Sequence, residues 1–313
     1  MAKVTVVGAG NVGATCANVL AFNKIADTVV MLDVKQGVAE GKAIDMLQTV
    51  QTLGFETSII GVTNDYAATA GSDVIIVTSG IPRKPGMTRE ELIGTNANIV
   101  SSVVSQCIAH SPDAVFVIIS NPMDTMTYLT LKTTGLPKNK VIGMGGTLDS
   151  ARFQYYLSQA LKVNQAEIEG IVIGGHGDTT MIPLKRLATY NGVPVSSLLD
   201  AATLDKAVAD TMVGGATLTG LLGTSAWYAP GAAGAYVAAS IINNYRRMIP
   251  SCVYLEGEYG QKDICIGVPA IIGRNGVEAI VDVHLNDEEK ALFEKSANAV
   301  RGTNDVLKEI GAL

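Results

Sequence analysis

The clearest chemical signature in the chain is a glycine-rich segment near the N-terminus. Residues 8–13 read Gly-Ala-Gly-Asn-Val-Gly, which is the pattern G-x-G-x-x-G. Glycines at this spacing permit a tight turn and let backbone N–H groups approach a pyrophosphate at the start of a helix. A β-rich run precedes the pattern and a helix-like segment follows it, which favours a dinucleotide-binding turn over a tight turn without a ligand. The expected cofactor contacts here are Gly8, Gly10, Asn11, Val12 and Gly13.

An acidic residue follows at the distance expected for ribose recognition. Asp33 lies twenty residues after Gly13, at the end of the second β-rich run. A carboxylate at this place accepts hydrogen bonds from the ribose hydroxyls and repels the 2′-phosphate of NADP. We therefore predict NAD as the cofactor.

A second segment concentrates positive charge. Residues 80–89 read Gly-Ile-Pro-Arg-Lys-Pro-Gly-Met-Thr-Arg, with three cations within seven residues and no acidic residue. The segment follows a β-rich run, and ligands of open parallel sheets bind beyond the carboxyl ends of the strands. It is either a solvated basic loop or a mobile lid that delivers Arg83 and Arg89 to an anion.

Two further segments carry groups suited to acid–base chemistry or to binding an anion. His176 lies between Gly175 and Gly177 after a β-rich run, where backbone can lie close to a bound molecule. An imidazole titrates near physiological pH, so this setting favours proton transfer over a structural role. Asp149 and Arg152 share one face of a helix-like segment, and by themselves they could form a local surface ion pair. The other histidines, His110 and His284, suit structural or surface positions.

The first half of the chain alternates β-rich runs with helix-like segments that would position these groups. Several runs are apolar throughout, as in Val74–Val77, which is typical of parallel strands covered by helices on both faces. We predict a Rossmann-type doubly wound α/β domain. The predicted strands are 3–8, 28–33, 58–62, 73–79, 114–120 and 141–145, and the predicted helices are 13–24, 37–53 and 89–109.

The second half has a different pattern, which predicts a mixed α+β substrate domain. We place the boundary near Gly143, giving domains 1–143 and 144–313. A closing helix should begin after Asn286, because Asp287, Glu288 and Glu289 follow it in the first turn. The predicted elements before it are a helix at 147–161 and strands at 168–174, 252–258, 264–272 and 278–285.

Composition excludes several classes of protein. The 313 residues carry a net charge of −6 and only 5% are aromatic, which argues against nucleic acid as the main partner. The uncharged stretch 211–245 is rich in Gly, Ala, Thr and Ser and contains Pro230. We expect buried helices there rather than a membrane span.

The cysteines and the N-terminus bear on the cellular compartment. The four cysteines show neither zinc-ligand nor Cys-x-x-Cys spacing, so we expect free buried thiols and no metal site. A β-rich run begins within three residues of Met1, and we expect no targeting segment. Free thiols suit a reducing compartment, and we expect a cytoplasmic protein.

Taken together, these segments resemble the lactate/malate dehydrogenase family over essentially the whole chain. The most specific matches are the runs 120–124 (Ser-Asn-Pro-Met-Asp), 148–153 (Leu-Asp-Ser-Ala-Arg-Phe) and 175–178 (Gly-His-Gly-Asp). The resemblance implies NAD-dependent oxidation of a small 2-hydroxy acid by a homodimer or homotetramer. Within this family Arg83 occupies a lid position that is typically Arg in enzymes acting on malate and Gln in those acting on lactate. A malate enzyme of the lactate-dehydrogenase-like group is therefore expected, with a lactate or other 2-hydroxyacid enzyme as the alternative.

The resemblance also implies roles for individual residues. His176 would transfer the proton, oriented by Asp149, while Arg152 would bind the first carboxylate of the substrate. Arg89 would polarise the carbonyl, and Arg83 would bind the second carboxylate of a dicarboxylate substrate. The residues expected along the cofactor are Asn96, Ile119 and Asn121, and Asn121 would also contact the substrate. No role is assigned to the segment 224–227. A dinucleotide-binding sensor without catalysis is disfavoured, because the acid–base pair and the placed arginines would then have no role.

Overall fold

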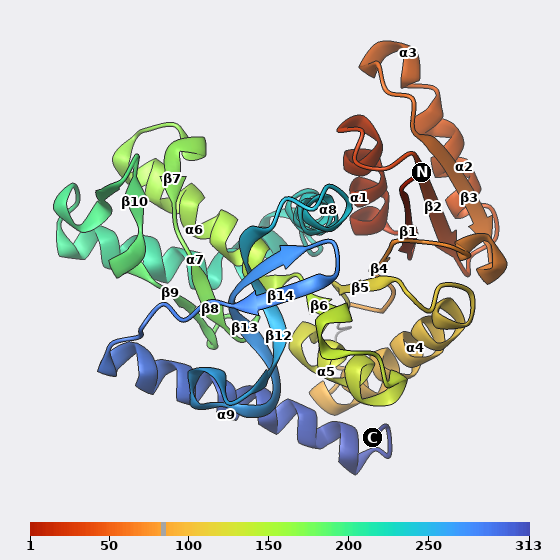
Figure 1. The fold of residues 1–313 in the computed structure, drawn as a ribbon. Helices are drawn as coiled ribbons and strands as arrows, with labels where there is room; N and C mark the ends of the chain where they lie inside the picture. The colour runs from red at the N-terminus through yellow and green to blue at the C-terminus, as the bar shows by residue number, and fades with distance from the viewer. Residues whose placement is uncertain (83–85) are drawn as a thin grey trace.

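A computed structural model describes residues 1–82 and 86–313 of the chain (Figure 1). The elements of the first half alternate strand and helix, as the apolar runs predicted. They are β1 (Lys3–Val7), α1 (Asn11–Phe22), β2 (Thr28–Asp33), α2 (Val38–Leu47), α3 (Val50–Leu53), β3 (Ser58–Thr63), β4 (Val74–Val77), α4 (Arg89–His110), β5 (Val115–Ile118), α5 (Met123–Thr134) and β6 (Val141–Gly143). The elements of the second half are α6 (Gly145–Leu161), β7 (Ile168–Glu169), β8 (Val172–Gly174), β9 (Met181–Pro183), β10 (Thr189–Tyr190), β11 (Val193–Pro194), α7 (Ala201–Leu222), α8 (Tyr228–Ile242), β12 (Arg247–Glu256), β13 (Lys262–Gly273), β14 (Gly276–Ile280) and α9 (Asp287–Glu309).

The strands of the first half form a parallel sheet in the order β3-β2-β1-β4-β5-β6. Successive side chains of a strand point to opposite faces, so a strand that is apolar throughout feeds two cores. Val74 and Ile76 of β4 pack into a core that includes α1 and α8. Ile75 and Val77 pack into a second core that includes α4 and α5. The predicted doubly wound sheet is confirmed.

The second half continues the same sheet with antiparallel strands. β12 pairs with β6 and with β13, which in turn pairs with β8 and β14, and β9 lies at the end of this path. A separate small sheet has the order β11-β10-β7. Below the antiparallel strands, α9 crosses back to pack against α4 and α5 (Figure 1). Leu307 of α9 is fully buried in the core that α4 and α5 share. The predicted mixed second half is confirmed.

Several elements of the second half differ from the sequence prediction. The predicted strand 168–174 is divided between β7 and β8, which belong to different sheets. Between them a side chain at Gly170 would come within 3.0 Å of the Phe153 ring, so the chain there packs tightly on α6. The alternating run 278–285 is a strand only as far as Ile280. The predicted cap of the closing helix is confirmed, because Asn286 and Glu289 form a capping box.

The uncharged stretch 211–245 forms the end of α7 and most of α8. Burial of α8 is confirmed, and its residues from Gly234 to Ile241 are almost all inaccessible to solvent. The expectation of burial is wrong for the end of α7, where Leu221 is 78% exposed. By length and apolar composition, α4 is a helix that could cross a membrane. Its apolar side chains, including Ile93, Val100 and Val104, are instead part of the second core.

All four cysteines are buried and unpaired, as predicted. Burial raises the pKa of the Cys16 and Cys107 thiols to about 12. A thiol with so high a pKa is almost entirely protonated at neutral pH and is chemically inert.

In the turn between β1 and α1, the conformation and packing of the backbone require glycine at two of the three glycine positions. Gly8 has a φ of +99°, in the region that side chains disfavour. A Cβ at Gly13 would collide with the carbonyl oxygen of Gly8, because α1 begins directly against the end of β1. Gly10 differs, because a Cβ there would meet no atom within 4 Å and its φ of −66° suits any residue.

We predict that Gly13→Ala destabilises the protein far more than Gly10→Ala does. Gly13→Ala should lower the free energy of unfolding by about 3 kcal/mol or more, because the added methyl group overlaps backbone that cannot yield. Gly10→Ala should change it by less than about 1 kcal/mol. Chemical denaturation of both variants beside the wild type measures the difference. A Gly13→Ala variant as stable as the wild type would contradict this packing.

Candidate active site

The carboxyl ends of the parallel strands open into two adjoining cavities. The larger, of about 820 Å³, is lined by residues that include Gly8, Gly10 and Asp33. The other, of about 370 Å³, is lined by residues that include Arg152 and His176. The two cavities share lining residues, which are Thr78, Gly80 and Ile81. Together they form a continuous cleft, which lies where open parallel sheets bind their ligands.

The first cavity brings the glycine turn and Asp33 together. The Asp33 carboxylate accepts hydrogen bonds from the main-chain N–H groups of Ala9 at 2.6 Å and Lys35 at 2.9 Å. These bonds place a fixed negative charge beside the turn. The space in front of Gly10 and the start of α1 is open, so a phosphate can approach the backbone N–H groups there. The residues present therefore fit a dinucleotide whose ribose hydroxyls meet a carboxylate.

The remaining residues predicted along the cofactor are distributed around the second cavity. Val12, Asn96, Ile119 and Asn121 all belong to its lining. Asn11 is exposed at the first position of α1, outside the described lining of either cavity.

Asn96 is more than a lining residue. Its side chain is buried and forms hydrogen bonds with the backbone of Ile81 and with the carbonyl oxygen of Asn121, the latter at 2.7 Å. It therefore ties together the segments that follow β4 and β5.

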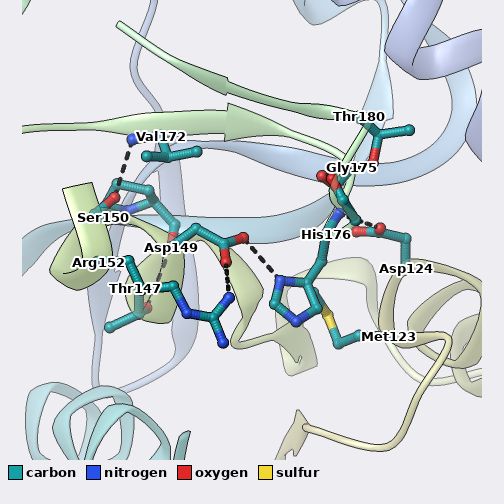
Figure 2. Close-up of polar contacts among 12 residues, drawn as sticks. Met123, Asp124, Thr147, Asp149, Ser150, Arg152, Val172, Gly175, His176 and Thr180 are labelled. Carbon is teal, nitrogen blue, oxygen red and sulfur yellow. Dashed lines mark hydrogen bonds and ion pairs between the residues drawn. The ribbon is translucent and has the colours of Figure 1, made fainter. Parts of the chain in front are cut away.

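His176 and Arg152 line the second cavity, and the buried carboxylate of Asp149 lies behind them (Figure 2). Asp149 and Arg152 project from the first half of α6, and His176 follows β8. One Asp149 oxygen contacts Nδ1 of His176 at 2.7 Å, and the other accepts a hydrogen bond from Arg152 at 3.1 Å. The Asp149 side chain is 3% exposed, so this carboxylate is paired on both sides and shielded from water. With Nδ1 engaged, Nε2 of His176 is left for a substrate.

Glycines allow the histidine to approach α6. A Cβ at Gly145 would lie 2.8 Å from the His176 side chain and would collide with Met123, whose side chain lies beside the imidazole (Figure 2). Gly174, with a φ of +87°, turns the chain after β8. The main-chain N–H of Gly175 then donates to Ser296 of α9 at 2.9 Å. The segment that carries the imidazole is thus held between α6, at Gly145, and α9, at Ser296.

The charges around His176 favour its protonated form. Burial of the ring opposes the charged form, but the negative charge of Asp149 and its hydrogen bond to Nδ1 outweigh burial. Asp124 adds a smaller effect in the same direction, while Arg152 opposes it. The net result is a pKa of His176 above its ordinary value of 6.5. A histidine with such a pKa can both take and give a proton near neutral pH.

The predicted arginines lie in different situations. Arg152 borders the second cavity, and its buried Nε has no hydrogen-bond partner among the described residues. Arg89 is exposed in the first turn of α4 and lines a third cavity, which also reaches His176 from the side of α5. Arg83 lies outside the described residues. Asn121 is exposed at the rim of the second cavity.

Some residues of the site carried no prediction. Ser225 and Ala226, in the segment left unassigned, line the second cavity together with Thr219 and Gly215 of α7. Asp124 contacts the main chain of His176, and Ser296 contacts that of Gly175. The motif 120–124 contained Asp124, but its spacing alone gave no indication that it faces His176.

Comparisons with known proteins agree with this architecture. Residues 2–143 match the NAD-binding domain of lactate/malate dehydrogenases, and residues 146–309 match their α/β C-terminal domain. A malate dehydrogenase from Parabacteroides distasonis is 70% identical over 313 residues, which are 100% of both chains. A malate dehydrogenase from Flavobacterium frigidimaris is 66% identical, covering 98% of this chain and 99% of its own.

Solved structures show the same likeness. The malate dehydrogenase from Salinibacter ruber has a TM-score of 0.94 at 42% identity, covering 98% of each chain. The lactate dehydrogenase from Cryptosporidium parvum, complexed with lactic acid and nicotinamide adenine dinucleotide, has a TM-score of 0.93 at 36% identity, also covering 98% of each chain. The chain belongs to the lactate/malate dehydrogenase family.

Proposed function

We propose that the protein is an NAD-dependent malate dehydrogenase that interconverts (S)-malate and oxaloacetate. The observation that carries this proposal is the contact of the buried Asp149 with both His176 and Arg152, which line the cleft. A proton acceptor and a carboxylate-binding guanidinium are the two groups that a 2-hydroxy acid needs at its reacting carbon. Residues 1–143 would bind NAD, and residues 144–313 would supply most of the substrate site.

The residues of the cleft have distinct roles in this reaction. When bound, NAD accepts the hydride, and the protein supplies position and charge. Nε2 of His176 takes the proton from the substrate hydroxyl, and Asp149 fixes the tautomer and stabilises the imidazolium. Arg152 grips the first carboxylate, which decides the face of the substrate that meets the nicotinamide.

The remaining assignments complete the binding of substrate and cofactor. Arg89 polarises the carbonyl, and Asn121 contacts both substrate and cofactor. Gly8, Gly10, Val12 and Gly13 form the pyrophosphate turn, Asp33 binds the ribose, and Asn11, Asn96 and Ile119 flank the cofactor. Arg83 binds the second carboxylate. Support for this last role comes from the basic character of its segment and from the malate dehydrogenase names of the relatives.

The alternative is a lactate or other 2-hydroxyacid dehydrogenase. The similarity to the Cryptosporidium parvum lactate dehydrogenase means that the fold is common to both activities. Discrimination therefore depends on the second carboxylate of the substrate, and hence on Arg83.

We also propose that the protein forms a homodimer or homotetramer in the cytoplasm. Large apolar side chains are exposed on α7 and α8, where they are available to contact a second subunit. They include Val213, Leu221, Leu222, Tyr228 and Tyr236. The four buried free thiols support a reducing compartment.

Cofactor choice should follow Asp33. Asp33→Ser removes the acceptor for the ribose hydroxyls and the charge that repels a 2′-phosphate. We expect the ratio of kcat/KM for NADH to that for NADPH to fall by about 10- to 100-fold, the effect of a hydrogen bond to a charged group. Asp33→Asn is the comparison variant, because its single amide oxygen can still accept from the N–H of Ala9, while the charge and the bond from Lys35 are lost. A wild type that uses NADPH as well as NADH would remove Asp33 from this role.

Proton transfer by His176 predicts a pH dependence. Malate oxidation needs the neutral imidazole, so the acid limb of kcat/KM for malate should have its midpoint above pH 6.5. Asp149→Asn removes the main cause that raises the pKa of His176, and the midpoint should move to lower pH. His176→Asn should lower kcat by about 10²- to 10⁴-fold while NADH binding remains. Near-normal turnover in His176→Asn would return this histidine to a structural role.

The selectivity for malate should depend on Arg83. Removing one partner of an enclosed charge pair costs about 2–5 kcal/mol. Arg83→Gln should therefore reduce kcat/KM for oxaloacetate by about 30- to 3,000-fold. Pyruvate has no second carboxylate and should lose nothing. The assay is oxidation of saturating NADH with each ketoacid, in wild type and variant. Equal losses for the two ketoacids would mean that Arg83 serves lid closure or the fold, and the case for malate over lactate would lose its main support.

A further inference from the structure

A second carboxylate lies directly behind His176. Asp124 belongs to the first turn of α5, and the residue is 7% exposed. One of its oxygens accepts a hydrogen bond of 2.7 Å from the main-chain N–H of His176 (Figure 2). Asp149, on α6, contacts the ring of the same residue. His176 is therefore held at its backbone by one carboxylate and at its ring by another.

Satisfying the backbone N–H does not require a charge at this position. The second oxygen of Asp124 is buried and has no N–H or O–H donor among the described residues; its polar neighbour is the Cys252 thiol, which is a weak donor. Burying a carboxylate in this way is costly, whereas a neutral asparagine could accept the same hydrogen bond. The start of α5 offsets part of the cost, because a helix N-terminus favours a negative charge. The hydrogen bond to His176 therefore does not explain why a charged residue occupies this position.

The charged groups around the imidazole give a reason for the negative charge of Asp124. From α6, Asp149 faces His176, but Arg152 shares this carboxylate. Once His176 is protonated, Asp149 would stand between two cations. The other charged groups nearby are Arg89 of α4 and Asp178 of the loop after His176, both lining the cavity on the α5 side, and the Cys252 thiol of β12 lies beside Asp124. With Asp124 included, two buried carboxylates face two cations, which are Arg152 and the protonated His176.

The ionisation of the two residues is linked in both directions. Burial raises the pKa of Asp124, and the N–H and the positive charge of His176 act against that rise. In return, the negative charge of Asp124 contributes to raising the pKa of His176. Each group therefore stabilises the charged form of the other.

We propose that Asp124 is a positioning residue for His176: its carboxylate fixes the main chain that carries the imidazole, and its negative charge balances the imidazolium. In malate oxidation the proton passes from the substrate hydroxyl to Nε2 of His176, and Asp124 itself exchanges no proton. The expected effect on kcat/KM rests on the proposed dehydrogenase function. The expected effect on the titration of His176, measured without substrate, is independent of that function.

The experiment separates the charge of Asp124 from its hydrogen bond. Asp124→Asn keeps an acceptor for the His176 N–H and loses the charge, whereas Asp124→Ala loses both. Glu289→Gln is the matched control, because Glu289 is also buried and also accepts a main-chain N–H, from Asn286. NMR titration follows the ring of His176, which is one of three histidines and is assigned by its loss in His176→Asn. The pH profile of kcat/KM for malate is recorded in parallel.

We expect Asp124→Asn to move the His176 midpoint to lower pH by about 0.5–1 unit, as for loss of one nearby opposite charge. The acid limb of the kcat/KM profile should move with it. Asp124→Ala should show the same shift and a kcat about tenfold below that of Asp124→Asn, because the backbone is then also released. Glu289→Gln should leave the midpoint in place.

An unchanged His176 midpoint in Asp124→Asn overturns the proposal, even if kcat or stability falls. Should that variant not fold, Asp124→Glu retains the charge and extends toward the cavity lined by Thr180 and Thr303. Its midpoint should stay within about 0.3 unit of the wild type while kcat falls, and a midpoint lowered by 0.5 unit or more would contradict the charge role. A shifted titration in a protein that does not oxidise malate would overturn the proposed function and leave the role of Asp124 standing.

Discussion

The buried carboxylate of Asp149 contacts the imidazole of His176 and the guanidinium of Arg152 at the same time, and the surrounding structure keeps it there. A carboxylate withdrawn from water is tolerated only when cations and hydrogen-bond donors surround it closely. This requirement explains why α6 begins with Gly145, where a larger residue would displace both Met123 and His176. It also explains why the chain after β8 is fixed by Ser296 from α9. One ionic contact thus depends on elements from distant parts of the sequence.

The fold and the main residues of the site could be predicted from the sequence because their signals are local. An apolar run such as Val74–Val77 identifies a strand buried on both faces by itself. The glycine turn, with Asp33 at its expected distance, depends only on spacing along the chain. Asp149, Arg152 and His176 were recognisable because each lies within a short motif. The structure then placed these three side chains within hydrogen-bonding distance.

What the sequence did not reveal depends on contacts between distant segments. Asp124 and His176 are 52 residues apart, and no periodicity shows that they meet. The alternating run has the pattern of a strand beyond Ile280, but the edge of β13 on which it lies is taken by β8 from Gly267 onward. After the Val281 N–H donates to Pro269, the run therefore leaves the sheet. The end of α7 is as free of charge as α8, yet one is exposed and the other buried, because composition does not say which helix lies against the sheet.

The path of α9 has a consequence for how the protein is made. This helix is synthesised after every other described element, yet Leu307 is buried in the core that α4 and α5 share in the first half. Chains emerge from their N-terminus, and domains commonly fold as they appear. The nascent first half therefore presents an apolar surface that stays uncovered until α9 has been synthesised. During that interval the exposed apolar surface can associate with other chains, so aggregation competes with folding.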